Sequence, residues 1–133
     1  MKSFLFRHGP LLTALFMLLF CHSVVAADRA LLIGVGKYSN SAYDLPGIDI
    51  DIRRMEVLSR QLGYDQRKLL SNREATTANV EKTIREWLIE GVGPNDRALL
   101  YFSGHGTRIP DDNGDEPDNA DEVLALFAAG SKG

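Results

Sequence analysis

The sequence contains very little cysteine and histidine. Among its 133 residues there are one cysteine, Cys21, and three histidines, His8, His22 and His105. All but His105 fall within the first 27 residues, so the rest of the chain has one imidazole and no thiol. A segment without cysteine forms no disulfide and no cysteine-based zinc site. Any imidazole chemistry after residue 27 must therefore centre on His105.

The chain also lacks an excess of basic residues and several common motifs. Its 15 Lys and Arg residues are outnumbered by 18 Asp and Glu residues, and no basic stripe occurs, so we expect no nucleic-acid partner. Neither phosphate-binding glycine pattern is completed around Gly34 to Lys37, which disfavours a nucleotide site. The G-x-S-x-G pattern is absent, which disfavours a serine hydrolase.

The first 27 residues resemble a secretory signal peptide. Lys2 and Arg7 precede the apolar run Leu11 to Phe20, and small residues follow at 24–26. The apolar run is too short for a comfortable membrane span, although an uncleaved anchor is the alternative. We therefore expect a signal peptide over 1–27 and a secreted or periplasmic domain over 28–133, with no membrane association after cleavage.

After the leader, short apolar runs alternate with amphipathic stretches. The runs 30–35 and 97–102 predict strands covered on both faces, and 66–70 predicts a weaker one. One helix is expected to begin near Asp49 or Asp51 and end at Gly63, with Ile52, Met55, Leu58 and Leu62 on one face. A second helix is expected from Thr76 or Thr77 to Gly91. This alternation predicts an α/β domain with a mostly parallel sheet.

The most distinctive stretch is the end of the third predicted strand. Ser103, Gly104, His105, Gly106 and Thr107 follow an apolar run, at the edge where open α/β sheets place their chemistry. An imidazole there is suited to act as a general base near neutral pH. Ser103 is close in sequence, but its side chain need not point toward the imidazole.

An acidic segment follows His105. Seven of the twelve residues from Asp111 to Glu122 are acidic. Hard cations prefer clustered carboxylates, so Asp111, Asp112 and Asp115 are candidate calcium ligands, although the spacing is not that of an EF-hand. The alternative is a solvated charged loop. Val123 to Phe127 is expected to begin a further strand.

Several blocks resemble the caspase-like cysteine peptidases, specifically the metacaspase and orthocaspase branch. The Y-F-S-G-H-G block at 101–106 is the most specific. The other matching pieces occur in the family's order: 30–38, 45–47 leading into Asp51, Asn79, and the D-E repeats between Asp115 and Leu124. The resemblance covers roughly residues 29–126.

This resemblance implies a fold and a chemistry. The fold would be the caspase-like α/β sandwich. His105 would belong to a Cys–His dyad, and Gly106 would offer its backbone N–H to the oxyanion. Substrates would be proteins or peptides cut after Arg or Lys. No cofactor would be required, and calcium would be an activator.

The sequence also departs from the family pattern. The family's cysteine follows the histidine by about 50 residues, which from His105 falls beyond Gly133. Phe127 to Ala129 stands where the family carries an aspartate linked to calcium. We therefore expect a domain incomplete at its carboxyl end, carrying the histidine part of a cysteine endopeptidase. The alternative is a non-catalytic caspase-like binding or regulatory module.

Overall fold

The computed structural model describes residues 27–129. The predicted signal peptide therefore lies, apart from Ala27, outside the described residues. No helix within 27–129 is long and apolar enough to cross a membrane. The fold described below is that of the domain predicted from residue 28 onward.

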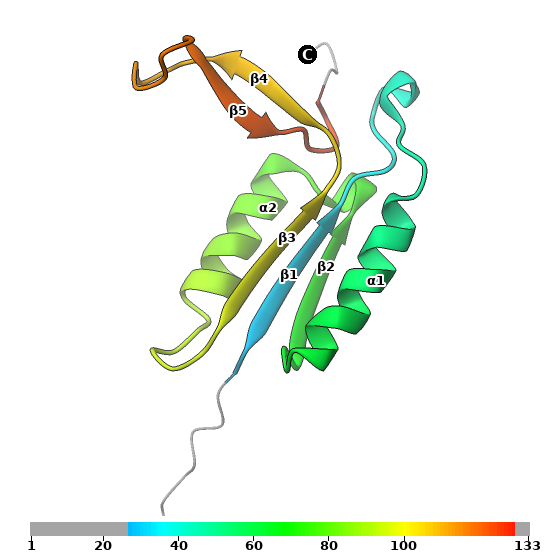
Figure 1. The fold of residues 1–133 in the computed structure, drawn as a ribbon, viewed down its shortest axis with the longest axis vertical. Coiled ribbons are helices and arrows are strands. Elements are labelled where there is room, and N and C mark those ends of the chain that lie inside the picture. Colours follow the sequence, from blue (N-terminus) through cyan, green and yellow to red (C-terminus); the bar gives the residue numbers. More distant parts are fainter. Residues whose placement is uncertain (1–26, 130–133) are drawn as a thin grey trace, which may run out of the picture.

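Three parallel strands form the centre of the domain (Figure 1). They are β1 (Arg29–Gly34), β2 (Gln66–Ser71) and β3 (Ala98–Ser103), and their order in the sheet is β2-β1-β3. The most apolar run takes the middle position, because only there are both edges paired and both faces covered. Residues 30–34 of β1 are all buried. The predicted α/β class and parallel sheet are confirmed.

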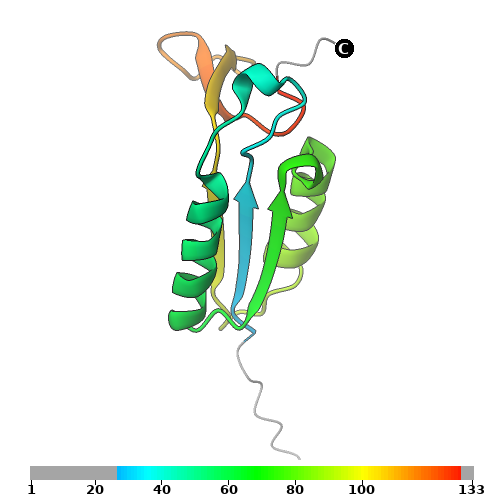
Figure 2. The same cartoon turned by 90° about the vertical axis from the view of Figure 1, so that its right-hand side faces the viewer.

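Helices cover opposite faces of this sheet (Figure 2). On one face α1 (Ile48–Gln61) packs its Ile52 against Ala30 and Leu32 of β1. On the other face lies α2 (Thr77–Thr83), which continues into the π-helical segment η3 (Ile84–Ile89) and packs against Leu31 and Ile33. Successive side chains of β1 point to opposite faces, so one strand supplies both apolar cores.

The helix ends agree only partly with the prediction. Thr76 caps α2 as predicted, since its hydroxyl accepts the N–H of Asn79 at 3.3 Å. The first helix instead begins at Ile48, and its cap is Gly47 with φ of 90° and no side-chain hydrogen bond. Asp49 lies in the first turn, where its charge suits the positive end of the helix. A left-handed glycine, not a carboxylate, therefore starts α1.

The apolar face predicted for α1 is wrong at two positions. Ile52 is buried, whereas Leu58 and Leu62 are 45% and 49% exposed. The fully buried residue one step along is Ser59, which lies seven residues after Ile52 and therefore on the same helix face. Its hydroxyl donates to the carbonyl of Glu56 at 3.1 Å. At the end of α1 a serine whose hydroxyl is hydrogen-bonded within the helix is thus buried, whereas Leu58 and the C-cap residue Leu62 face solvent.

The third strand is less covered than predicted. Leu100 of β3 is 47% exposed, although its register partner on β1, Leu31, is fully buried. The reason is position, because β3 is an edge of the three-stranded sheet and η3 packs over β1. The apolar run 97–102 therefore forms a strand, but one covered on both faces only in part.

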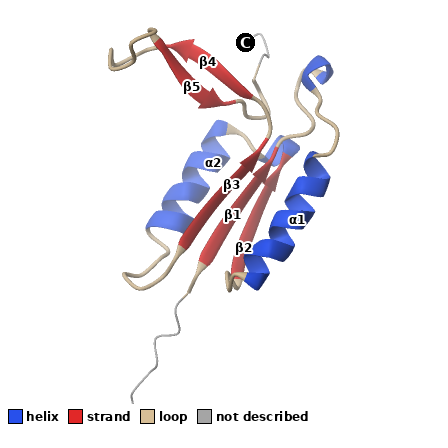
Figure 3. Ribbon diagram, in the orientation of Figure 1, coloured by secondary structure: helices blue, strands red, loops and turns tan. Residues whose placement is uncertain are grey.

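A β-hairpin follows the sheet (Figure 3). It differs from the single strand predicted near the end of the sequence. Its strands are β4 (Gly106–Pro110) and β5 (Ala120–Leu124), which pair antiparallel. The strand expected from Val123 to Phe127 thus begins at Ala120, and β4 was not predicted because its residues are all exposed and show no apolar alternation. Phe127 is outside the strand, and its N–H donates to the carbonyl of Ala75 at 3.0 Å.

The only tryptophan of the sequence, Trp87, belongs to η3 and lies at the amino end of the sheet, on the face that η3 covers. The Arg29 guanidinium and the Lys68 ammonium each lie 4.4 Å from the centre of the Trp87 ring. Arg29 also donates to the carbonyl of Trp87 at 3.2 Å. Trp87 therefore packs η3 against β1 and β2.

Candidate active site

The short connection between β3 and the hairpin lies at the carboxyl edge of the sheet (Figure 1). His105 belongs to this connection. Only Gly104 and His105 separate the end of β3 at Ser103 from the start of β4 at Gly106. The backbone of His105 is therefore held on either side by strands of two different sheets, which leaves it little conformational freedom. This is the edge at which the sequence predicted the chemistry.

Two tyrosines of the loop after β1 hold His105. Its backbone N–H donates to the Tyr38 hydroxyl at 2.9 Å, and its Nε2 lies 3.0 Å from the carbonyl oxygen of Tyr43. Because a carbonyl oxygen only accepts, this contact assigns the proton to Nε2. In the neutral imidazole Nδ1 is then the unprotonated nitrogen, which is the state required of a general base.

Gly104 allows this close approach. A Cβ at position 104 would lie 2.7 Å from Cζ of Phe102 and 3.0 Å from the Tyr38 hydroxyl oxygen. A side chain here would clash with the Phe102 ring and crowd the tyrosine that binds the N–H of His105. Steric crowding thus explains why a glycine stands before the histidine.

The N–H of Gly106 points away from the hairpin partner. Ala125 donates its N–H to the carbonyl of His105 at 2.9 Å, so positions 105 and 125 form a hydrogen-bonded pair. Gly106 and Leu124 are the next pair in this register. Hydrogen-bonded and non-bonded pairs alternate in an antiparallel ladder, which leaves the N–H of Gly106 directed outward.

Ser103 is directed toward α1. Its hydroxyl donates to Oδ2 of Asp51 at 3.1 Å, and both residues are half-buried. Ser103 pairs with Gly34, whose face of the sheet is covered by Ile52 of α1. The serine therefore presents its hydroxyl to a carboxylate, in agreement with the expectation that it need not point toward the imidazole.

A cavity of about 360 Å³ opens beside His105. It is lined by His105, Gly106 and Thr107 together with Tyr38, Tyr43 and Ala125. A separate cavity of about 440 Å³ lies between α1 and the β2 edge, and none of the described residues that line it is a histidine. We take the smaller cavity as the candidate active site because it holds the imidazole.

The acidic hairpin gathers three carboxylates. Asp111, Asp115 and Asp121 each place one oxygen within 4.8 Å of the others. The predicted candidate Asp112 is not in this group, whereas Asp121, which was not proposed, is. Hydrogen bonds from backbone N–H groups, chiefly that of Gly114, lower the pKa of the Asp111 carboxyl and favour its ionised form.

Comparison with known proteins decides the family. The caspase domain family matches residues 27–128. The chain belongs to the caspase domain family. The matched residues include the glycine-flanked histidine of the Y-F-S-G-H-G block on which the resemblance was based.

Similar proteins include two metacaspases. The caspase domain is 39% identical over 105 residues to metacaspase-3 of Arabidopsis thaliana, with 72% of this chain and 28% of that protein covered. It is 36% identical over 107 residues to metacaspase-1A of Aspergillus niger, with 72% and 26% covered. The chain thus spans about a quarter of the length of these relatives.

A solved structure supports the fold. Protein GSU0716 from Geobacter sulfurreducens superimposes with a TM-score of 0.63 at 28% sequence identity. The match covers 77% of this chain and 40% of that one. The caspase-like fold with its mostly parallel sheet is therefore confirmed.

Sequence reasoning about the caspase domain did not assign roles to several residues around His105. Tyr38 and Asp51 lie in the blocks that carry the family resemblance, and their place in those blocks was the signal that could have pointed to a role in the site. Tyr43 contributes a backbone carbonyl, which no residue type reveals. Asp121 was placed in a loop, yet it lies on β5 and reaches the other carboxylates through hairpin pairing.

Proposed function

We propose that residues 27–129 form the histidine-bearing part of a caspase-type cysteine endopeptidase site. The observation that carries the proposal is the contact of His105 Nε2 with the Tyr43 carbonyl, which leaves Nδ1 unprotonated in the neutral ring. The outward N–H of Gly106 and the adjacent cavity support it. Residues 28–133 contain no cysteine, so the thiolate would come from outside this segment.

The chemistry assigned to this chain is proton transfer and charge stabilisation. Nδ1 of His105 would accept the thiol proton, and the thiolate would attack the peptide carbonyl carbon. The N–H of Gly106 would donate to the oxyanion that forms. His105 would then return its proton to the leaving amine, while the Tyr43 carbonyl holds the imidazole through Nε2. Water would hydrolyse the thioester that remains.

We further propose that Asp51 selects a basic residue before the cleaved bond. Asp51 lies in the first turn of α1, its carboxylate is half-buried, and it accepts a hydrogen bond from Ser103, the last residue of β3 and two residues before His105. A partly desolvated carboxylate favours a guanidinium or ammonium group. The substrate class is therefore a peptide or protein with Arg or Lys at that position.

A chimera tests both proposals. Residues 27–129 replace the matching segment of Arabidopsis thaliana metacaspase-3, and hydrolysis of fluorogenic peptides ending in Arg or in Ala is measured. We expect the Arg peptide to be preferred. Asp51→Asn keeps an acceptor for Ser103 but loses the charge, so kcat/KM for the Arg peptide should fall about 10–100-fold, as expected for a charged hydrogen bond.

Asp49→Asn is the matched control for this experiment. Asp49 lies on the same turn of α1 but pairs with Arg53 at 2.8 Å and is 69% exposed, so its loss should leave the preference unchanged. A folded chimera that hydrolyses neither peptide would contradict the peptidase proposal. An active chimera whose Arg preference survives Asp51→Asn would contradict the specificity proposal alone.

We also propose that the hairpin binds calcium through Asp111, Asp115 and Asp121. Calcium–oxygen bonds of 2.3–2.6 Å place ligand oxygens up to about 5 Å apart, and the 4.8 Å limit of this cluster fits that spacing. Asp111 already accepts three backbone N–H groups, but a carboxylate has further lone pairs to offer. An ion here would join the loop to β5.

Calorimetric titration of the chain with calcium chloride measures this site. Asp115→Asn is expected to weaken calcium binding by on the order of tenfold or more, because it removes one of three anionic ligands. Asp112→Asn removes the neighbouring charge that lies outside the cluster and should bind like the parent. Equal losses in the two variants would indicate only general charge attraction, and no heat in the parent would dismiss the site.

The absence of cysteine from residues 28–133 supports a second candidate, a non-catalytic caspase-like binding module. Such a module needs the fold but not the imidazole contacts. The same chimera discriminates between the two, since a binding module would fold there without supporting hydrolysis. The held tautomer of His105 is the reason for preferring the peptidase proposal.

A further inference from the structure

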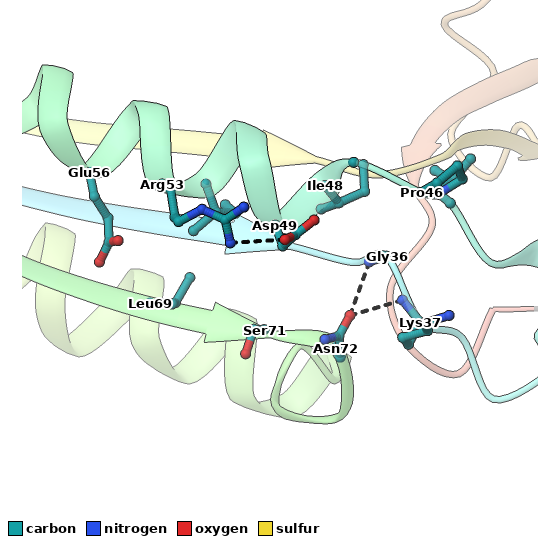
Figure 4. Close-up of a pocket in the computed structure, with 14 residues that line it drawn as sticks. Gly36, Lys37, Pro46, Ile48, Asp49, Arg53, Glu56, Leu69, Ser71 and Asn72 are labelled. Carbon is teal, nitrogen blue, oxygen red and sulfur yellow. Dashed lines mark hydrogen bonds and ion pairs between the residues drawn. The ribbon is translucent and has the colours of Figure 1, made fainter.

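Asn72 joins two segments that are distant in sequence. It follows β2 with φ of 48°, a left-handed conformation that asparagine tolerates better than most residues. Its Oδ1 accepts the N–H of Gly36 at 3.0 Å and the N–H of Lys37 at 2.9 Å (Figure 4). One carboxamide oxygen thus fixes two successive peptide groups just beyond β1.

Those two peptide groups begin a loop that closes on itself. The N–H of Leu45 donates to the carbonyl of Gly36 at 2.9 Å. Asp44 accepts the N–H of Tyr38 at 3.0 Å and the ammonium of Lys37 at 2.9 Å. These contacts, the backbone one first, lower the pKa of the Asp44 carboxyl and keep it ionised. The loop 36–45 is therefore a unit that Asn72 ties to the end of β2.

This loop supplies both groups that hold His105, the Tyr38 hydroxyl and the Tyr43 carbonyl. We propose that Asn72 is a positioning residue for His105, acting through the loop 36–45 without touching the imidazole. Its two hydrogen bonds keep the Tyr43 carbonyl where it selects the Nε2–H tautomer. The role of His105 as base rests on the proposed function, but the tautomer itself does not.

The position of the Tyr43 carbonyl matters because it determines which nitrogen of the imidazole carries the proton. A fixed acceptor at Nε2 favours the tautomer with a free Nδ1 lone pair. If the loop shifts, that acceptor moves, and the second tautomer, which blocks Nδ1 with a proton, becomes populated. Loss of the Asn72 oxygen also leaves two N–H groups at the base of the loop without their partner, so the loop is expected to shift.

Two substitutions separate the hydrogen bonds from the backbone conformation. Asn72→Asp keeps an oxygen that accepts both N–H groups and tolerates the left-handed region. Asn72→Gly tolerates that region equally well and removes the oxygen. Asn72→Ser, whose side chain is too short to span both N–H groups, repeats the removal if the glycine variant fails to fold.

The readout is nitrogen NMR of the imidazole in the full chain, labelled with 15N-histidine, at neutral pH. His105 is assigned by comparison with His105→Ala. In the parent and in Asn72→Asp we expect the widely separated ring shifts of a single Nε2–H tautomer. In Asn72→Gly we expect this separation to narrow, and the His105 amide to exchange on the order of tenfold faster.

Asn79→Ala is the control for general weakening. It removes the hydrogen bond from Asn79 to the carbonyl of Glu74 at 3.0 Å, close to Asn72, but leaves loop 36–45 untouched. It should leave the imidazole shifts of the parent unchanged. Parent-like shifts in Asn72→Gly, the same change in Asn79→Ala, or no rescue by Asn72→Asp would each overturn the proposal. The measurement needs no turnover, so failure of the peptidase proposal leaves it interpretable.

Discussion

Replacing His105 by alanine is expected to lower kcat/KM of the metacaspase-3 chimera by about 10²–10⁴-fold, the usual contribution of a general acid–base group. The reason is that residues 27–129 contain no second imidazole to accept the thiol proton. Hydrolysis of the Arg-ending fluorogenic peptide measures the effect. The loss should appear mainly in kcat, because the imidazole acts on the reacting bonds.

Lys82→Ala provides the comparison for this variant. Lys82 is an exposed residue near the end of α2, and it is not among the residues that line the cavity beside His105. Its loss should leave kcat/KM unchanged, and both variants should retain the circular dichroism of the chimera. A folded His105→Ala variant as active as the chimera would remove His105 from the chemistry.

Leu31→Ala is expected to lower the free energy of unfolding by about 2–5 kcal/mol, the range for a buried leucine that leaves a cavity. Leu31 is fully buried in the central strand, among the apolar side chains that join β1 to α2 and η3. A domain of this size has about 5–15 kcal/mol in total, so the variant should lose a large share of its stability. Urea denaturation of the chain measures the change.

Leu100→Ala is a control of the same chemistry in a neighbouring position. The two leucines are register partners on β1 and β3 and point to the same face, but Leu100 is 47% exposed. With only half of its surface to lose, it should cost about 1 kcal/mol or less. Equal costs for the two variants would mean that the edge strand is buried in solution.

The central fold could be predicted because its signals are local. The short aliphatic run 30–35, closed by Gly36, is typical of a buried strand, and Thr76 caps a helix through its own hydroxyl. The exposure of Leu100 could not be predicted, because it depends on which strands stand beside β3. The hairpin strand β4 was not predicted for the same reason. It is exposed, it shows no apolar pattern, and it is stabilised by pairing with β5.

The site shows the same division between local and tertiary signals. His105 and Gly106 could be singled out from the end of one apolar run. Their surroundings could not, because the groups around them come from the loop after β1 and from the first helix. Asn72 is the clearest example, since a side chain after β2 acts on backbone groups 35 and 36 residues earlier. Such a role depends on the strand order, which no local pattern contains.

The stacking of Arg29 and Lys68 on Trp87 has a practical consequence for the measurements made on the chain itself. Trp87 is the only tryptophan, and it lies at the amino end of the sheet, whereas His105 follows its carboxyl end. Its fluorescence therefore monitors the docking of η3 on the sheet separately from the imidazole. A variant that changes the imidazole signals while leaving the tryptophan emission intact has altered the site within a folded domain.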